Sequence, residues 1–183
     1  MKLNEIIILI LLPITIFAEE FHVDKEADNE VRFTSKTQIH EFDGITSEID
    51  GYVLLKDDGT NEFYFEIPLE TFDTGIGLRN RHMRENYLET EKYPYGIYNG
   101  NISEYEEIGD TLHVKTIGAM TVHGIENKMA ASVKMIKTLK GYQGLSSFTI
   151  NLKDYKIKVP SVMVMKLNEN IDIKVRIFFK EVK

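Results

Sequence analysis

Apolar and polar residues alternate with a period of two along most of the chain after Glu20, which is the pattern of half-buried β-strands. The alternation is clearest over residues 63–69 and 171–177. Weaker alternation marks six further stretches, residues 31–39, 46–55, 97–105, 112–122, 125–135 and 142–152. Residues that favour tight turns separate several of them, at 57–61, 108–110, 123–124 and 140–141. The pattern predicts about eight antiparallel strands joined by short turns.

One segment, residues 78–88, departs from this pattern. Its apolar residues are unevenly spaced and none is β-branched, which favours a short helix or helical turn over a strand. The Tyr93-Pro94 pair that follows favours extended backbone and restarts the strands.

About eight antiparallel strands can hide their edges in a closed barrel or in two packed sheets. Residues 112–122 would form a strand about 36 Å long at about 3.3 Å per residue, which favours the barrel. We therefore predict an all-β fold, an extended antiparallel eight-stranded β-barrel with one short helical segment. A barrel of this size is wide enough to hold one small ligand.

The amino-terminal residues form an apolar run over 6–17, broken only by Pro13 and Thr15 and followed by Ala18 and two glutamates. A spanning helix needs about 20 apolar residues, so this run is too short and is typical of a cleaved signal peptide. We predict a signal peptide over residues 1–18, cut after Ala18, and a periplasmic or secreted domain over residues 19–183. The alternative is an uncleaved anchor, because Glu5 weakens the positive start that export signals favour.

Composition narrows the function further. With 183 residues, of which 43% are hydrophobic, the chain can build one core, and one domain is expected. The formal net charge of -7 argues against nucleic acid as a partner. The chain has no cysteine, which excludes disulfides, thiolate nucleophiles, cysteine-ligated zinc and iron–sulfur clusters.

The pattern of chemically active residues predicts no metal, cofactor or catalytic site. His113 and His123 would lie about 33 Å apart on one strand, too far to share an ion. His22 and Asp24 supply only half a site, and no nucleophile elbow or phosphate loop is present. A triad from distant positions or a pair of carboxylates stays open as an alternative. Charged residues on the outside of a barrel explain the carboxylates more simply.

Six methionines of the mature chain are the one compositional sign of a cavity: Met83, Met120, Met129, Met135, Met163 and Met165. Flexible thioethers suit a cavity that must adapt to an elongated apolar ligand. The alternative is that they simply fill the core.

Four sequence blocks closely resemble the YceI-like family in order and spacing: residues 72–75 (FDTG), 79–83 (RNRHM), 91–94 (EKYP) and 118–125 (GAMTVHGI). Residues 21–24 (FHVD) and 148–160 (FTINLKDYKIKVP) resemble the ends of that family's domain. The resemblance implies an extended, lipocalin-like barrel that is usually exported. In some members its interior holds a polyisoprenoid or a similar amphipathic lipid.

Three positions depart from the family pattern. Asn80 stands where the family usually has Asp, Met83 where it has Leu, and Tyr87 where Phe is frequent. Asn80 removes a charge that could have paired with Arg79. If such a pair shapes the barrel mouth, the mouth of this protein differs.

The expected function is that of an exported protein that sequesters or carries an isoprenoid-type lipid, such as a quinone or its precursor, without chemistry of its own. Transfer of a tail from bilayer to cavity is apolar to apolar and nearly neutral, so a barrel can load and release at transient membrane contacts. The alternatives are an enzyme that uses His82 or His123 as acid or base, and a filled barrel that acts through another protein. The sequence indicates no oligomeric state.

The helical segment is expected to cap or border the cavity. The candidate lining and mouth residues are Phe33, Phe65, Ile67, Arg79, His82, Met83, Tyr87, Met120, Val122, His123, Phe148 and Ile150.

Overall fold

A computed structural model describes residues 18–37, 40–56, 59–158, 161–162, 165–166 and 168–182. The expected signal peptide, apart from Ala18, lies outside the described residues. So do Met163 and the Val159-Pro160 pair that ends the last family block.

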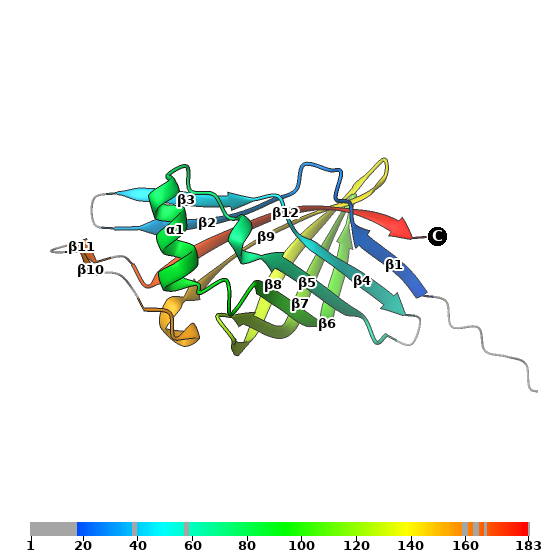
Figure 1. Cartoon of the computed structure of the whole chain (residues 1–183). Helices are drawn as coiled ribbons and strands as arrows, with labels where there is room; N and C mark the ends of the chain where they lie inside the picture. Colours follow the sequence, from blue (N-terminus) through cyan, green and yellow to red (C-terminus); the bar gives the residue numbers. More distant parts are fainter. Residues whose placement is uncertain are drawn as a thin grey trace, which may run out of the picture.

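The described chain is mostly strand (Figure 1). Its strands are β1 (Ala18–Val23), β2 (Glu30–Lys36), β3 (Glu41–Thr46), β4 (Asp50–Lys56), β5 (Glu62–Pro68), β6 (Tyr95–Ile108), β7 (Thr111–Val122), β8 (Ile125–Thr138), β9 (Gly141–Asn151), β10 (Ser161–Val162), β11 (Met165–Lys166) and β12 (Asn170–Val182). Its helical elements are η1 (Leu69–Thr71), α1 (Gly77–His82), η2 (Met83–Tyr87) and η3 (Leu152–Tyr155).

Eight strands close into an antiparallel barrel in the order β1, β4, β5, β6, β7, β8, β9, β12, and β12 pairs back to β1. The last strand also holds the β2–β3 hairpin, because its first half pairs with β2 and its second half with β1. Ile173 lies opposite Phe33, and Phe179 lies opposite Val23. The predicted eight-stranded barrel with one short helix is therefore confirmed.

Strand boundaries differ from the prediction where the chain turns without glycine or proline. The run predicted over residues 46–55 belongs to two strands, since β3 ends at Thr46 and β4 begins at Asp50. The Thr46 hydroxyl accepts a hydrogen bond from the Glu48 amide at 3.0 Å, which stabilises the turn locally. The apolar Ile49 in this turn is buried, and this preserves the alternation across the break.

The predicted helical segment is α1 continued by one π-helical stretch, η2. It lies against β3 at one end of the barrel, where the Arg79 guanidinium sits 4.1 Å from the centre of the Phe42 ring (Figure 1). Met83 is buried in the main core with Leu69 and Phe72. Among the described residues, no helix is long and apolar enough to cross a membrane.

A second, smaller core lies near η3 and is built on three buried residues, Val122, Tyr155 and Ile157. The predicted turn at His123-Gly124 stands beside it and joins β7 to β8. Both residues have positive φ, 52° and 69°, as a two-residue type I′ hairpin turn requires.

Candidate functional site

The barrel encloses an elongated apolar cavity with a volume of about 160 Å³. Along β7 its lining runs from Leu112 to Met120, which is about 26 Å at about 3.3 Å per residue. The other apolar residues that line it include Ile49, Val53, Leu55, Phe63, Ile102, Ala131, Val133, Met135, Val175 and Ile177. All of these except Ile49, which lies in the turn before β4, are the inward positions of strands whose alternate residues face out, so the period of two along the sequence creates most of this lining.

Aromatic rings narrow the cavity. Phe63 packs on Tyr98 with ring centres 4.7 Å apart, and Phe65 packs edge-on against Phe179 at 5.9 Å. An apolar cavity of about 150 Å³ accepts a molecule of benzene's size, so this one accepts roughly one isoprene unit as it stands. A longer tail must displace lining side chains, and the unbranched Met120 and Met135 are the most adaptable of them.

Polar groups in the cavity are few, and the two at its centre along β6 and β7, on Tyr98 and Thr116, are paired. The Tyr98 and Thr116 hydroxyls are 2.9 Å apart, and the Thr116 hydroxyl donates to the Ala131 carbonyl at 3.1 Å. Burial raises the pKa of Tyr98, so its hydroxyl stays protonated at neutral pH. Among the lining residues that the structure describes, Glu19 is the only carboxylate and none is histidine or lysine. The cavity is therefore suited to binding an apolar ligand.

Four of the predicted site residues line this cavity together: Phe65, Ile67, Met120 and Phe148. Phe33 does not line it and packs instead on Phe72, with ring centres 5.3 Å apart. Met83 is buried in the main core. The remaining predicted apolar residues belong to the second core, Val122 as a buried member and Tyr87 and Ile150 packed against it.

The three predicted polar residues also lie away from the cavity lining. His82 is exposed on α1. His123 Nε2 is 2.6 Å from Glu89 Oε2, and its Nδ1 is 3.1 Å from the Tyr155 carbonyl oxygen. His123 therefore ties the β7–β8 turn to η3 and to the residues after η2. None of the described residues of α1 and η2 lines the cavity, so the helical segment covers one end of the barrel without bordering the cavity.

Arg79 is held without a carboxylate partner among the described residues. Its guanidinium donates to the Thr74 hydroxyl at 2.9 Å and to the Thr74 carbonyl at 2.6 Å. Asn80 uses both ends of its amide: Oδ1 accepts from the Thr74 amide at 2.8 Å, and Nδ2 donates to Asp73 Oδ1 at 2.7 Å. The donation from Asn80 lowers the pKa of Asp73.

Replacing Asn80 by Asp, the residue that the family resemblance implies here, should destabilise the protein at neutral pH, because the hydrogen bond from the Asn80 amide to Asp73 is lost. The new carboxylate cannot donate to Asp73 and would repel it. The lowered pKa of Asp73 stabilises the folded wild type above the ordinary carboxyl pKa, and this contribution is lost as the pH falls through the folded pKa. Thermal unfolding should therefore separate Asn80→Asp from wild type most at pH 7 and least near pH 3. An equal difference at both pH values would contradict this account.

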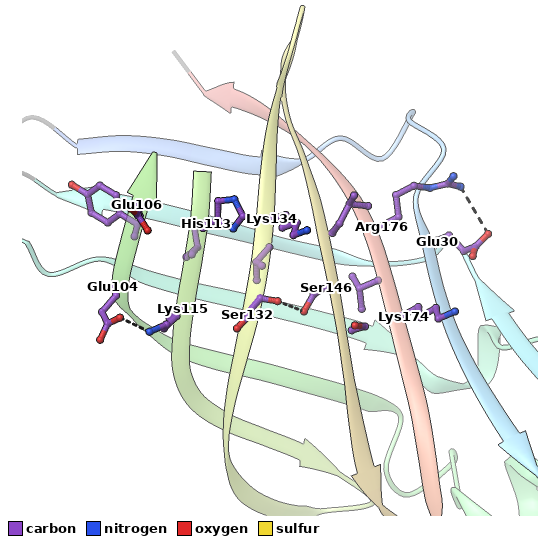
Figure 2. Close-up of a pocket in the computed structure, with 16 residues that line it drawn as sticks. Glu30, Glu104, Glu106, His113, Lys115, Ser132, Lys134, Ser146, Lys174 and Arg176 are labelled. Carbon is purple, nitrogen blue, oxygen red and sulfur yellow. Dashed lines mark hydrogen bonds and ion pairs between the residues drawn. The ribbon is translucent and has the colours of Figure 1, made fainter. Parts of the chain in front are cut away.

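A second hollow, the outer groove, lies on the outside of the barrel and has a volume of about 760 Å³ (Figure 2). It crosses β6, β7, β8, β9 and β12, and its charged residues are Glu30, Glu104, Glu106, His113, Lys115, Lys134, Lys174 and Arg176. Sequence reasoning did not identify it. The sequence does contain basic residues two positions apart at outward positions of single strands. Only the order of the strands in the barrel shows that these residues lie side by side.

No group of three or more His, Cys, Asp or Glu side chains that could hold a metal ion occurs in the described part of the chain. His22 lies beside Glu20, with Nε2 2.5 Å from Oε1.

The fold and the cavity define a closed, eight-stranded antiparallel barrel with an apolar interior. A family model for the YceI-like domain matches residues 21–179. The chain belongs to the YceI-like family. The resemblance of its sequence blocks to that family is therefore confirmed.

Solved structures show the same fold. BcnA from Burkholderia cenocepacia superposes with a TM-score of 0.69 at 14% identity, covering 88% of this chain and 99% of that one. A polyisoprenoid-binding domain from Saccharophagus degradans, implicated in plant cell wall breakdown, has a TM-score of 0.68 at 14% identity and covers 88% and 98%. A YCEI protein from Campylobacter jejuni has a TM-score of 0.61 at 16% identity and covers 80% and 88%. No curated relative matches the chain.

Proposed function

We propose that this protein is an exported binding protein that sequesters or carries an isoprenoid-type amphipathic lipid, with the tail in the barrel cavity. The observation that carries the proposal is the cavity itself, an elongated and mostly apolar space with few polar groups, two of which, the Tyr98 and Thr116 hydroxyls, pair with each other. Each buried CH₂ group contributes about 0.8 kcal/mol relative to water, so even a short tail segment binds appreciably.

The family and the fold support a binding role. The similar domain from Saccharophagus degradans is a polyisoprenoid-binding domain, and the present chain shares its barrel. Transfer of the tail between membrane and cavity exchanges one apolar environment for another, so such a barrel both loads and releases.

The placement of the histidines favours binding over the alternative of an enzyme acting on the lipid. His82 is exposed on α1 and His123 is bonded to Glu89, and neither lines the cavity. A general acid or base must lie within hydrogen-bond reach of the reacting group. A ligand in the cavity would meet neither ring.

The proposal is tested by extraction of protein purified without detergent, followed by mass spectrometry of the extract. The expected result is a long-tailed apolar molecule in near-stoichiometric amount, held in a cavity that its lining side chains widen. Extracts that repeatedly contain no such molecule, together with failure of the protein to take up added lipid, would favour the filled barrel. Export rests on residues 1–18, and the intact mass of protein recovered from the exported fraction should correspond to a chain that begins at Glu19.

A further inference from the structure

The outer groove is lined by four cationic side chains, Lys115, Lys134, Lys174 and Arg176, and by three carboxylates, Glu30, Glu104 and Glu106. Lys115 pairs with Glu104 at 2.7 Å on one rim, and on the other Arg176 pairs with Glu30 at 3.8 Å (Figure 2). Arg176 also pairs with Asp28 at 2.9 Å. Between these pairs, Lys134 and Lys174 make no ion pair with any described residue. A protein with a net charge of -7 thus presents two unpaired ammonium groups in one concave site.

Strand register concentrates this charge. Lys134 on β8 lies directly opposite His113 on β7, and Lys174 on β12 lies opposite Ser147 on β9. Lys174 also lies opposite Arg32 on β2, and like charges directly opposite each other on a sheet are destabilising. An anion bound between Lys134 and Lys174 would be attracted by both ammonium groups, and the nearby hydroxyls of Ser132 and Ser147 are available as donors to it.

Two neighbouring strands of the barrel wall, β8 and β9, stop pairing beneath this groove. The β8–β9 ladder extends only as far as the pair formed by Val133 and Ser146. Beyond it, residues 125–132 of β8 pair with β7 alone and residues 147–151 of β9 pair with β12 alone, within the described strands. The Ser146 hydroxyl donates to the Ser132 carbonyl at 2.8 Å just past the last pair, and Figure 2 shows the two strands diverging below this bond.

The outer groove and the inner cavity meet at this divergence. Val133 and Ser146 line both, and the cavity continues past them to Ala131 on β8 and Phe148 on β9. A cationic site outside the wall therefore adjoins an apolar site inside it, at the one place where the two strands between them stop pairing.

From this juxtaposition we propose that the outer groove binds the anionic head group, a phosphate or carboxylate, of an amphipathic ligand whose tail passes between β8 and β9 into the cavity. The proposal rests on the binding function proposed above and adds the head-group class and the route of entry. Lys134 and Lys174 hold the anion, and the separated strand segments admit the tail.

The head-group site is tested with dodecyl phosphate and dodecanol, which share one tail and differ in charge. By calorimetry at low salt, wild type should bind the phosphate at least about tenfold more tightly than the alcohol. The double variant Lys134→Ala with Lys174→Ala should lose this preference and bind dodecanol as wild type does. The matched control is Lys128→Ala with Lys140→Ala, which removes two exposed lysines outside the groove and should keep the preference.

Inorganic phosphate separates a lipid head group from a free anion. The proposal expects phosphate alone to bind far more weakly than dodecyl phosphate. Equal affinity would mean a free-anion site unconnected to the cavity, and an unchanged preference in the Lys134 and Lys174 variant would mean that the groove does not hold the head group. Either result overturns the inference while leaving the lipid-binding function intact. Failure of wild type to bind both dodecyl probes would overturn the function and the inference together.

The route is tested by cross-linking, since the chain has no cysteine and any introduced pair is unique. Ser132→Cys with Ser147→Cys, joined by a bismaleimide, places a bridge across the diverging strands and should slow dodecyl phosphate uptake at least about tenfold. The control pair, Ile136→Cys with Gln143→Cys, lies opposite within the intact ladder and should leave uptake unchanged. Uptake at the wild-type rate in the first cross-linked protein would overturn entry between β8 and β9.

Discussion

Ala131→Phe should weaken ligand binding strongly while the barrel still folds. The Ala131 side chain lines the cavity, whose volume is about 160 Å³. An apolar cavity of about 150 Å³ accommodates benzene, so the added ring occupies nearly all of the available space. We expect dodecanol binding to fall by at least about tenfold. The measurement is calorimetric titration on protein whose thermal unfolding remains cooperative.

The neighbouring residue supplies the control for this prediction. Ala130 is exposed on the outer side of β8, so Ala130→Phe adds the same ring without entering the cavity. It should bind dodecanol like wild type. If Ala131→Phe fails to fold, the smaller Ala131→Val narrows the same space and should weaken binding by a lesser amount. Wild-type affinity in folded Ala131→Phe would show that the ligand binds elsewhere.

Gly118→Val should destabilise the barrel by about 3 kcal/mol or prevent folding altogether. Gly118 on β7 lies opposite Gly100 on β6. A Cβ added at Gly118 would collide with the Asn99 carbonyl oxygen and stand 3.1 Å from Gly100 Cα. Both are backbone atoms that cannot swing away as a flexible side chain does, so the β6–β7 ladder must separate locally and lose hydrogen bonds.

The control for Gly118 is the next residue along β7. Ala119 has the opposite strand parity, so Ala119→Val places the same side chain on the outer side of the sheet, where β-branched residues are favourable. Urea denaturation should move its midpoint only slightly. Gly118→Ala provides a milder second variant that should still lower the midpoint clearly. A wild-type midpoint in Gly118→Ala would mean that the backbone accommodates a Cβ at this close approach.

The sequence alone predicted the barrel because its principal signal, the period of two, directly reports which residues face the interior. It missed the break between β3 and β4, because a threonine hydroxyl, and not glycine or proline, stabilises that turn. The short β1 has too few residues to show a convincing alternation by itself. Its place in the barrel depends on partners far along the chain, in β4 and β12.

The structure places the predicted site residues according to their position along each strand as well as their parity. Met120 and Val122 share a parity on β7, as Phe148 and Ile150 do on β9, yet only Met120 and Phe148 line the cavity. The second core, with Tyr155 at its centre, occupies the inside of the barrel at the Val122 and Ile150 level. The alternation of apolar and polar residues within one strand does not show which part of the barrel interior is occupied by residues distant in the sequence. The same limit applies to Arg79 and His82, whose helix was predicted but whose orientation was not.

The pairing of β12 has a consequence for the order in which the chain folds. This strand follows all the other barrel strands along the chain and pairs with β9, β1 and β2, so three strands lack a neighbour until residues 170–182 have docked. Contacts of such large sequence separation form slowly, because the loop-closure entropy must be overcome first. Until then the β1–β4 edge and the β2–β3 hairpin present unpaired backbone on which another chain could add. A chain that lacks residues 170–182 would therefore accumulate as an open, association-prone sheet, because β12 is the strand that closes the barrel on β1.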